Sequence, residues 1–160
     1  MKLRVVGCFL FYKGKFLILQ RRKDKSEPLK WGLPAGKVDK GETDQEALIR
    51  ELWEETSYKA NKEQLLYLGE TNWKFTTKEI DFSTFRVNLN EQIIVKIQPK
   101  EHQDYKWVTA REAYYMGEEL IHGLKDILVM LGYVNKMESE YATKYLNKTV
   151  KIKMDRPKGS

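Results

Sequence analysis

Three glutamates lie within five residues of one predicted helix, at positions 51, 54 and 55. Side chains three and four residues apart are neighbours on a helix, so these carboxylates gather on one edge and repel one another by a few tenths of a kcal/mol per pair. A single nearby cation, Arg50, does not balance three anions. Hard divalent cations with oxygen ligands would, and Mg²⁺ or Mn²⁺ suits such a cluster. On the carboxylates alone, a solvated acidic helix face explains the pattern equally well.

The segment before this helix favours the metal site. Residues 31–36 read Trp-Gly-Leu-Pro-Ala-Gly, a composition that fixes backbone shape in a turn. Backbone carbonyls around Ala35 and Gly36 could complete a set of oxygen ligands. Thr43, followed three residues later by Glu46, forms a capping box, which predicts that the helix starts there and runs to about Thr56.

These residues resemble the signature of the Nudix hydrolase family, G-x5-E-x7-R-E-U-x-E-E-x-G-U, in which U is aliphatic. The matching positions are Gly36, Glu42, Arg50, Glu51, Leu52, Glu54 and Glu55. Ser57 stands where the signature has its last glycine, and Tyr58 stands at the aliphatic position. That glycine supports a left-handed turn, and a serine there costs about 1 kcal/mol. The carboxylates are intact, so we expect an active enzyme.

The resemblance implies the roles of the site residues. Glu51, Glu54 and Glu55 would hold Mg²⁺, or Mn²⁺, together with the Ala35 carbonyl. Arg50 would orient a glutamate of the signature, and Glu42 would bind metal through water or brace the loop.

A second segment, Glu101-His102-Gln103-Asp104-Tyr105-Lys106-Trp107, resembles one found in MutT-like and dinucleoside-polyphosphate-cleaving members. Glu101 is the candidate for an additional metal ligand or general base, with an ordinary surface carboxylate as the alternative. Candidate substrate contacts are Arg21 and Arg22 for phosphate and Phe75 and Tyr105 for stacking on a base. Each of the four also has an ordinary structural explanation, a solvated strand end or a core aromatic.

The whole chain predicts an α+β protein. It has 160 residues, one cysteine and no apolar run long enough for a membrane span, so we expect a cytoplasmic protein without disulfides. Predicted strands cover Leu3–Tyr12, Phe16–Arg22, Leu65–Thr77, Ile80–Leu89 and Gln92–Ile97, with further helix from Ala110 and over Leu120–Leu131. The resemblance implies a Nudix fold, an α/β/α sandwich around a mixed β-sheet, over residues 1–132. We expect residues 133–160 to form a helical C-terminal extension, which is basic and carries +4 of the net charge of +6.

The expected activity is Mg²⁺-dependent cleavage of a pyrophosphate bond in a nucleoside diphosphate derivative. A nucleoside triphosphate or a dinucleoside polyphosphate is the first expectation, and a nucleotide sugar or capped RNA is the alternative. A non-catalytic nucleotide- or RNA-binding domain is the rival class. The basic extension could bind RNA through phosphates, or it could be a solvated terminal segment. The sequence leaves the oligomeric state open, with a homodimer as one option.

Overall fold

A β-hairpin opens the chain, which is described here by a computed structural model of residues 1–135. Strands β1 (Lys2–Tyr12) and β2 (Lys15–Arg21) pair antiparallel, with Tyr12 opposite Lys15. Lys13 and Gly14 have φ angles of 48° and 78°, so both turn residues are left-handed. A two-residue turn of this kind matches the right-handed twist of the strands it joins. The predicted hairpin is confirmed.

The hairpin forms the centre of a mixed sheet with the order β3-β2-β1-β6-β5. The added strands are β3 (Trp31–Gly32), β4 (Ala35–Lys37), β5 (Leu66–Lys74), β6 (Glu79–Asn88) and β7 (His102–Val108). Strand β6 runs parallel to β1 and antiparallel to β5. Strand β4 pairs with β1, and β7 pairs with β2. The turn segment and the Glu101 segment, far apart in sequence, are therefore joined to the same hairpin.

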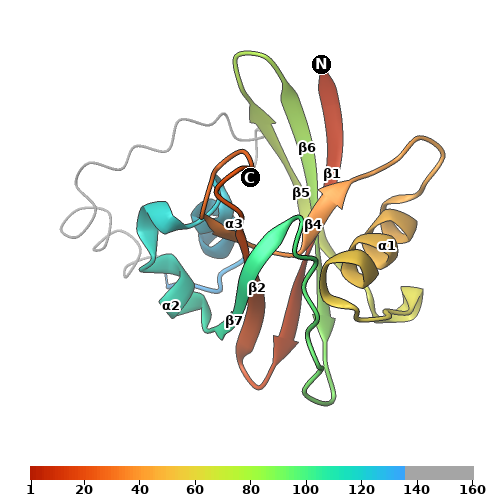
Figure 1. Cartoon of the computed structure of the whole chain (residues 1–160), viewed down its shortest axis with the longest axis vertical. Coiled ribbons are helices and arrows are strands. Elements are labelled where there is room, and N and C mark those ends of the chain that lie inside the picture. Colours follow the sequence, from red (N-terminus) through yellow and green to blue (C-terminus); the bar gives the residue numbers. More distant parts are fainter. Residues whose placement is uncertain (136–160) are drawn as a thin grey trace.

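Both faces of the hairpin are buried, which explains its nearly continuous apolar sequence. Val6, Cys8 and Leu10 point to one core, which helix α1 (Asp44–Thr56) covers. Phe9, on the opposite face, packs in a second core with residues of α2 (Ala110–Tyr114) and α3 (Leu124–Met130). Figure 1 shows α1 on one side of the sheet and α2 and α3 on the other. The α+β sandwich with a mixed sheet is confirmed.

Two predicted elements differ from the structure. Residues 92–97, expected as a strand, form no strand, although Ile93, Val95 and Ile97 alternate inward onto the α1 core. The Lys96 amide donates to the Thr56 carbonyl at 3.0 Å, so this segment bonds to the end of a helix instead of a sheet edge. The helix expected over Leu120–Leu131 is shorter, because Gly123 has a φ of 94° and α3 begins after it.

Short 3₁₀ turns lie at Lys62–Gln64 and Gly117–Glu119. Within residues 1–135, no helix is long and apolar enough to cross a membrane. The predicted helical extension, residues 133–160, lies almost wholly outside the described residues.

Candidate active site

Helix α1 presents its glutamates from a well-defined start. Thr43 Oγ1 accepts from the Glu46 amide at 3.1 Å, and Glu46 Oε1 accepts from the Thr43 amide at 2.9 Å. This is the predicted capping box, and it assigns Glu46 to the helix start. The helix ends at Thr56, and Ser57 adopts the left-handed conformation with a φ of 63°. The helix end thus keeps the turn that glycine normally makes there.

The three glutamates of the signature have different surroundings. Glu55 is buried, and its Oε1 accepts a hydrogen bond from the Ala35 amide at 2.9 Å. The side chain of Glu51 is 13% exposed, whereas that of Glu54 is 50% exposed. One edge of the helix therefore carries one deep, one intermediate and one outer carboxylate.

Glycine at position 36 is required by the closeness of Glu51. A Cβ atom built on Gly36 would overlap the Glu51 carboxyl group, so any side chain here would displace it. Strand β4 consequently lies directly against the edge of α1 that carries the carboxylates. The backbone of residues 35–36 and the glutamates form one cluster of oxygen atoms and amide groups.

Arg50 braces this cluster. Its Nε and Nη2 donate to the two Glu42 carboxylate oxygens at 2.8 and 2.9 Å, a bidentate pair. Its Nη1 donates to Glu51 Oε1 at 2.8 Å, and Nη2 also donates to the Lys37 carbonyl at 3.0 Å. Glu42 itself accepts from the Asp39 amide at 2.8 Å. Glu42 and Arg50 thus join the loop before α1 to the helix.

The pKa values of these carboxylates are shifted in different directions. Hydrogen bonds from Arg50 and from the Asp39 amide lower the pKa of Glu42 to about 2. Burial raises the pKa of Glu51 despite the neighbouring guanidinium. Burial also raises the pKa of Glu55 well above its ordinary value, and the negative charges of Glu51 and Glu101 raise it further. The ionised form of Glu55 is therefore costly despite the Ala35 amide and Arg21, and a cation ligated by Glu55 would offset that cost.

Glu101 joins the cluster from the other side of the hairpin. It lies immediately before β7, where its amide donates to the Gln98 carbonyl at 3.0 Å. Its side chain is 51% exposed and its Oε1 lies 3.5 Å from Lys25 Nζ. Since its charge acts on Glu55, the fold brings together the two acidic segments that the sequence singled out.

These carboxylates line one end of a cavity of about 660 Å³. All four predicted acidic ligands, Glu51, Glu54, Glu55 and Glu101, contribute to its lining. The lining also has apolar side chains, Trp73, Phe75, Ile121 and Leu124, and the part of the cavity that they line is called its apolar end. A molecule with a charged part and a flat apolar part matches this division.

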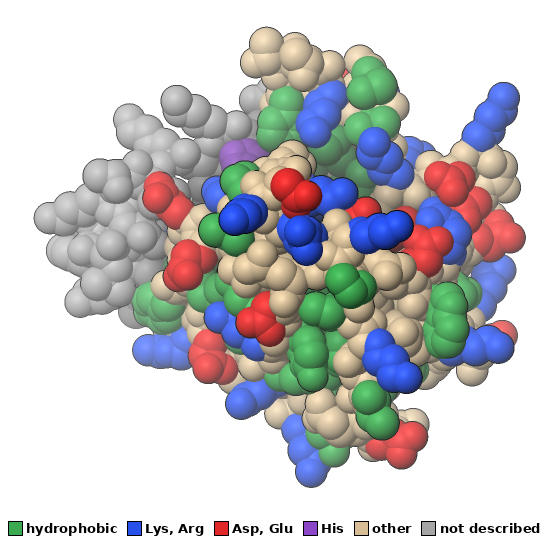
Figure 2. Space-filling model, viewed as in Figure 1, with side chains coloured by type: hydrophobic (Ala, Val, Ile, Leu, Met, Phe, Trp, Pro, Cys, Tyr) green, Lys and Arg blue, Asp and Glu red, His purple; other side chains and the backbone are tan. Residues whose placement is uncertain are grey.

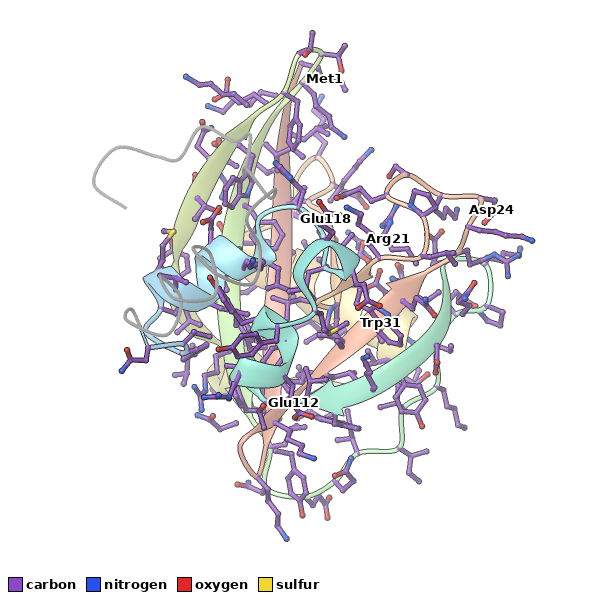
Figure 3. The ribbon with its side chains drawn as sticks, turned by 90° about the vertical axis from the view of Figure 1, so that its left-hand side faces the viewer. Met1, Arg21, Asp24, Trp31, Glu112 and Glu118 are labelled. Carbon is purple, nitrogen blue, oxygen red and sulfur yellow. The ribbon has the colours of Figure 1, made fainter. Side chains whose placement is uncertain are left out.

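Two of the four residues predicted to contact substrate line the cavity, and two do not. Arg21 and Phe75 line the cavity, whereas Arg22 and Tyr105 do not. Arg21 also donates to the Ser26 carbonyl at 2.6 Å, and Arg22 donates to the Pro99 carbonyl at 2.9 Å. Tyr105 is an exposed residue of β7. Figure 3 shows Arg21 in the same region as Trp31, at the base of the loop that follows β2.

Sequence reasoning missed the part of the cavity that comes from segments near residues 27 and 121. Ile121 fits against β3 because Gly32 leaves room for it: a Cβ on Gly32 would lie 2.6 Å from Ile121 Cγ1. The Ile121 amide donates to the Trp31 carbonyl at 2.8 Å. No spacing in the sequence links these segments, because their contact depends on how α3 packs against the sheet.

The donor set fits a hard divalent cation, although each carboxylate is turned to a partner of its own. Among residues 1–135, no three acidic, His or Cys side chains already converge as a finished metal site. Glu51 faces Arg50, Glu55 accepts from the Ala35 amide and Glu101 faces Lys25. Each of these contacts leaves carboxylate oxygens with further acceptor capacity. Oxygen atoms with surplus negative charge are the donors that hard divalent cations prefer.

The sequence of this chain is similar to those of known proteins. Residues 1–127 match the family model described as NUDIX domain. Phosphatase NudJ of Escherichia coli K12 is 29% identical over 109 residues, which cover 67% of this chain and 68% of that protein.

Solved structures share the fold. The MutT protein from Methanosarcina mazei Go1 superposes with a TM-score of 0.71 and 29% identity, covering 84% of this chain and 96% of that one. The E. coli ORF135 protein superposes with a TM-score of 0.65 and 21% identity, covering 93% and 95%. At 20% identity and a TM-score of 0.66, the fold also matches a bifunctional NMN adenylyltransferase/ADP-ribose pyrophosphatase from Francisella tularensis, solved with AMP and a Mn ion, covering 82% of this chain and 41% of that one.

Proposed function

The chain belongs to the Nudix hydrolase family, and from that premise we propose that it hydrolyses a pyrophosphate bond in a nucleotide with the help of Mg²⁺ or Mn²⁺. The observation that carries the proposal is the position of Glu55. This carboxylate is buried beside Glu51 at the acidic end of a cavity, and its negative charge is opposed by repulsion from two other glutamates. A bound cation would offset that cost.

Glu51, Glu54, Glu55 and the Ala35 carbonyl would hold the cation, and Glu101 would be either a further ligand or the general base. When bound, a divalent cation supplies positive charge that offsets the negative charge developing on the phosphoryl oxygens. Arg50 acts through Glu42 and Glu51: its bidentate pair and its bond to Glu51 keep the carboxylate edge of α1 in place. Arg50 is therefore a positioning residue.

Glu101 is the proposed general base. Its exposed carboxylate lies at the mouth of the acidic end, where an attacking water can reach it. In the reaction, the water oxygen forms a new P–O bond, the anhydride P–O bond breaks, and the water proton passes to the Glu101 carboxylate. The rigid helix and turn supply the positioning that attack by a single water requires.

A nucleoside triphosphate or a dinucleoside polyphosphate is the proposed substrate class. The resemblance of residues 101–107 to MutT-like and dinucleoside-polyphosphate-cleaving members supports this choice, and so does a cavity with an acidic and an aromatic end. A nucleotide sugar or capped RNA is the alternative, and for RNA the basic residues of 133–160 would add phosphate contacts. We further propose residues 1–132 as the catalytic domain and 133–160 as its extension.

A panel of substrates tests the proposal. Nucleoside triphosphates, dinucleoside polyphosphates, ADP-ribose and a nucleotide sugar are incubated with the protein in millimolar Mg²⁺ or in EDTA, and released phosphate or pyrophosphate is measured. We expect hydrolysis of at least one nucleotide in Mg²⁺ and none in EDTA. Tight nucleotide binding without turnover in any metal would identify a non-catalytic binding domain and overturn the proposal.

A further inference from the structure

Glu27 is a carboxylate of the cavity that the proposed chemistry does not use. It lies in the loop of residues 22–30 between β2 and β3, and it is half-buried in the lining of the cavity. Its φ of 47° and that of Leu29, 63°, are left-handed, which costs a residue with a side chain of order 1–3 kcal/mol. Such a conformation persists only where the surrounding structure fixes it.

The loop is fixed at its base and at Glu27 itself. Arg21 Nη2 donates to Ser26 Oγ at 2.9 Å, and the Arg21 amide donates to the Lys30 carbonyl at 2.9 Å. Glu27 Oε1 accepts from the His122 amide at 2.9 Å. The carboxylate is thereby held against the segment that forms the apolar end of the cavity.

Aromatic side chains share the lining of the cavity with Glu27. The rings of Phe75 and His122 have centroids 5.5 Å apart, and both residues line the cavity with Trp73. Aromatic side chains next to a cavity offer faces on which a nucleobase stacks, worth about 1–3 kcal/mol per base. The phosphates of a nucleotide would lie with the cation, at the glutamates of α1.

Glu27 has acceptor capacity to spare. A carboxylate has about four lone-pair sites, and the backbone bond from His122 uses one. Within residues 1–135, no lysine or arginine forms an ion pair with Glu27. An ionised carboxylate accepts hydrogen bonds and donates none, so a ligand group that faces it must be a donor.

We infer that Glu27 determines base specificity, accepting a hydrogen bond from the exocyclic amino group of adenine, guanine or cytosine. The inference rests on the proposed function, because it takes the apolar end of the cavity as the site of the base. Uracil and thymine have no exocyclic amino group, and their single ring donor, N3–H, lies between two carbonyl oxygens that a carboxylate repels. The substrate is thus an amino-bearing nucleotide.

The test measures binding separately from hydrolysis. Affinities for ATP, GTP, CTP and UTP are determined by isothermal titration calorimetry in Ca²⁺, with chromatography confirming that the nucleotides stay intact, for the wild type and for Glu27→Gln. We expect the wild type to bind at least one amino-bearing nucleotide tenfold or more tightly than UTP. Glu27→Gln should lose most of that preference, since its neutral amide can donate as well as accept. Equal wild-type affinities for all four nucleotides, or binding of none, would overturn the inference, and neither result depends on turnover.

Asp24→Asn is the matched control. It removes one negative charge from the same loop, but Asp24 pairs with Arg22 and does not line the cavity. Figure 3 shows Asp24 at the outer tip of the loop, away from Trp31. We expect Asp24→Asn to keep the wild-type preference, and a melting curve of each variant checks that it folds.

A ribose contact is the competing role for Glu27. If Glu27→Gln weakens ATP, GTP, CTP and UTP equally while leaving dATP unchanged, the carboxylate binds the ribose hydroxyls and the base assignment is overturned. If the variant keeps both the base preference and the affinities, Glu27 serves only to fix the loop, and the inference fails.

Discussion

Glu46 and Glu51 lie little more than one helical turn apart on α1, yet their side chains have different roles. Glu46 closes the capping box at the start of α1, whereas Glu51 lies against Gly36 beside the cavity. Glutamine can replace glutamate in a capping box, because its side-chain oxygen also accepts from the backbone amide. Glu46→Gln therefore neutralises a carboxylate of the same helix while leaving the capping box and the cavity intact.

The first prediction compares these positions. Glu51→Gln, Glu54→Gln and Glu55→Gln should each lower kcat by at least about a hundredfold, as the loss of a strong electrostatic stabiliser does. Glu46→Gln should change kcat by less than about threefold. Steady-state kinetics in saturating Mg²⁺ measure the four variants. Equal losses at all four positions would indicate general destabilisation of α1 and contradict the assignment.

A second prediction concerns Glu101 and its neighbour Asp104. Glu101→Gln should lower kcat by roughly 10²–10⁴ with little change in KM, the span that general acid–base catalysis covers. Among residues 1–135, the hydrogen bond that Asp104 Oδ1 accepts comes from the amide of the next residue, Tyr105, and Asp104 does not line the cavity. Asp104→Asn is therefore the matched control and should stay near the wild type.

The pH–rate profile decides the role of Glu101. Because burial raises the pKa values of Glu51 and Glu55, protonation of these ligands produces the acidic limb, and Glu101→Gln should lower the rate above that limb instead of abolishing the limb. An unchanged profile with near-normal kcat would remove Glu101 from the mechanism and leave a glutamate of α1 as the base.

At the scale of elements, the end of α1 is the feature that departs from the family signature. Ser57 is left-handed, its amide donates to the Trp53 carbonyl, and Thr56 Oγ1 donates to the Leu52 carbonyl at 2.6 Å. These bonds hold the turn, but serine still bears the steric cost of a Cβ in this conformation.

Ser57→Gly should therefore stabilise the protein. We expect the free energy of unfolding, measured by urea denaturation, to rise by about 1 kcal/mol. Ser57→Ala keeps the Cβ and should not gain this stability. A glycine variant no more stable than the alanine variant would show that the turn is not strained.

The elements also show what a sequence can specify. The hairpin turn, the capping box and the strands β5 and β6 were predictable, because each depends on residues close together in the chain. Residues 92–97 were not: alternating burial indicates an extended backbone but does not say whether its partner is a strand or, as here, the Thr56 carbonyl. The carboxylate end of the cavity followed from helical spacing, whereas the apolar end required the packing of residues 120–124 against β3.

At the scale of the whole molecule, charge is divided between the described body and the C-terminal residues. Residues 1–132 carry a net charge of only +2, and Figure 2 shows acidic and basic side chains interspersed on the face it presents. Residues 133–160 carry +4. A long polyanion would be attracted mainly by the C-terminal residues, whereas a small nucleotide would depend on the cavity.

The last prediction follows from this division. Replacing Lys144, Lys148, Lys151 and Lys153 with glutamine should weaken binding of single-stranded RNA and reduce the slope of log affinity against log salt concentration by about 3. Turnover of small nucleotides should stay unchanged. The control replaces four exposed lysines of the body, Lys13, Lys15, Lys59 and Lys62, and gives the same net charge. Filter binding at several salt concentrations measures both variants. The proposed RNA contact requires that the first set of substitutions reduce the slope more than the second, because only counterions released at the contact itself contribute to the slope. Equal reductions would mean that RNA binding depends on net charge alone, which would contradict the proposed contact.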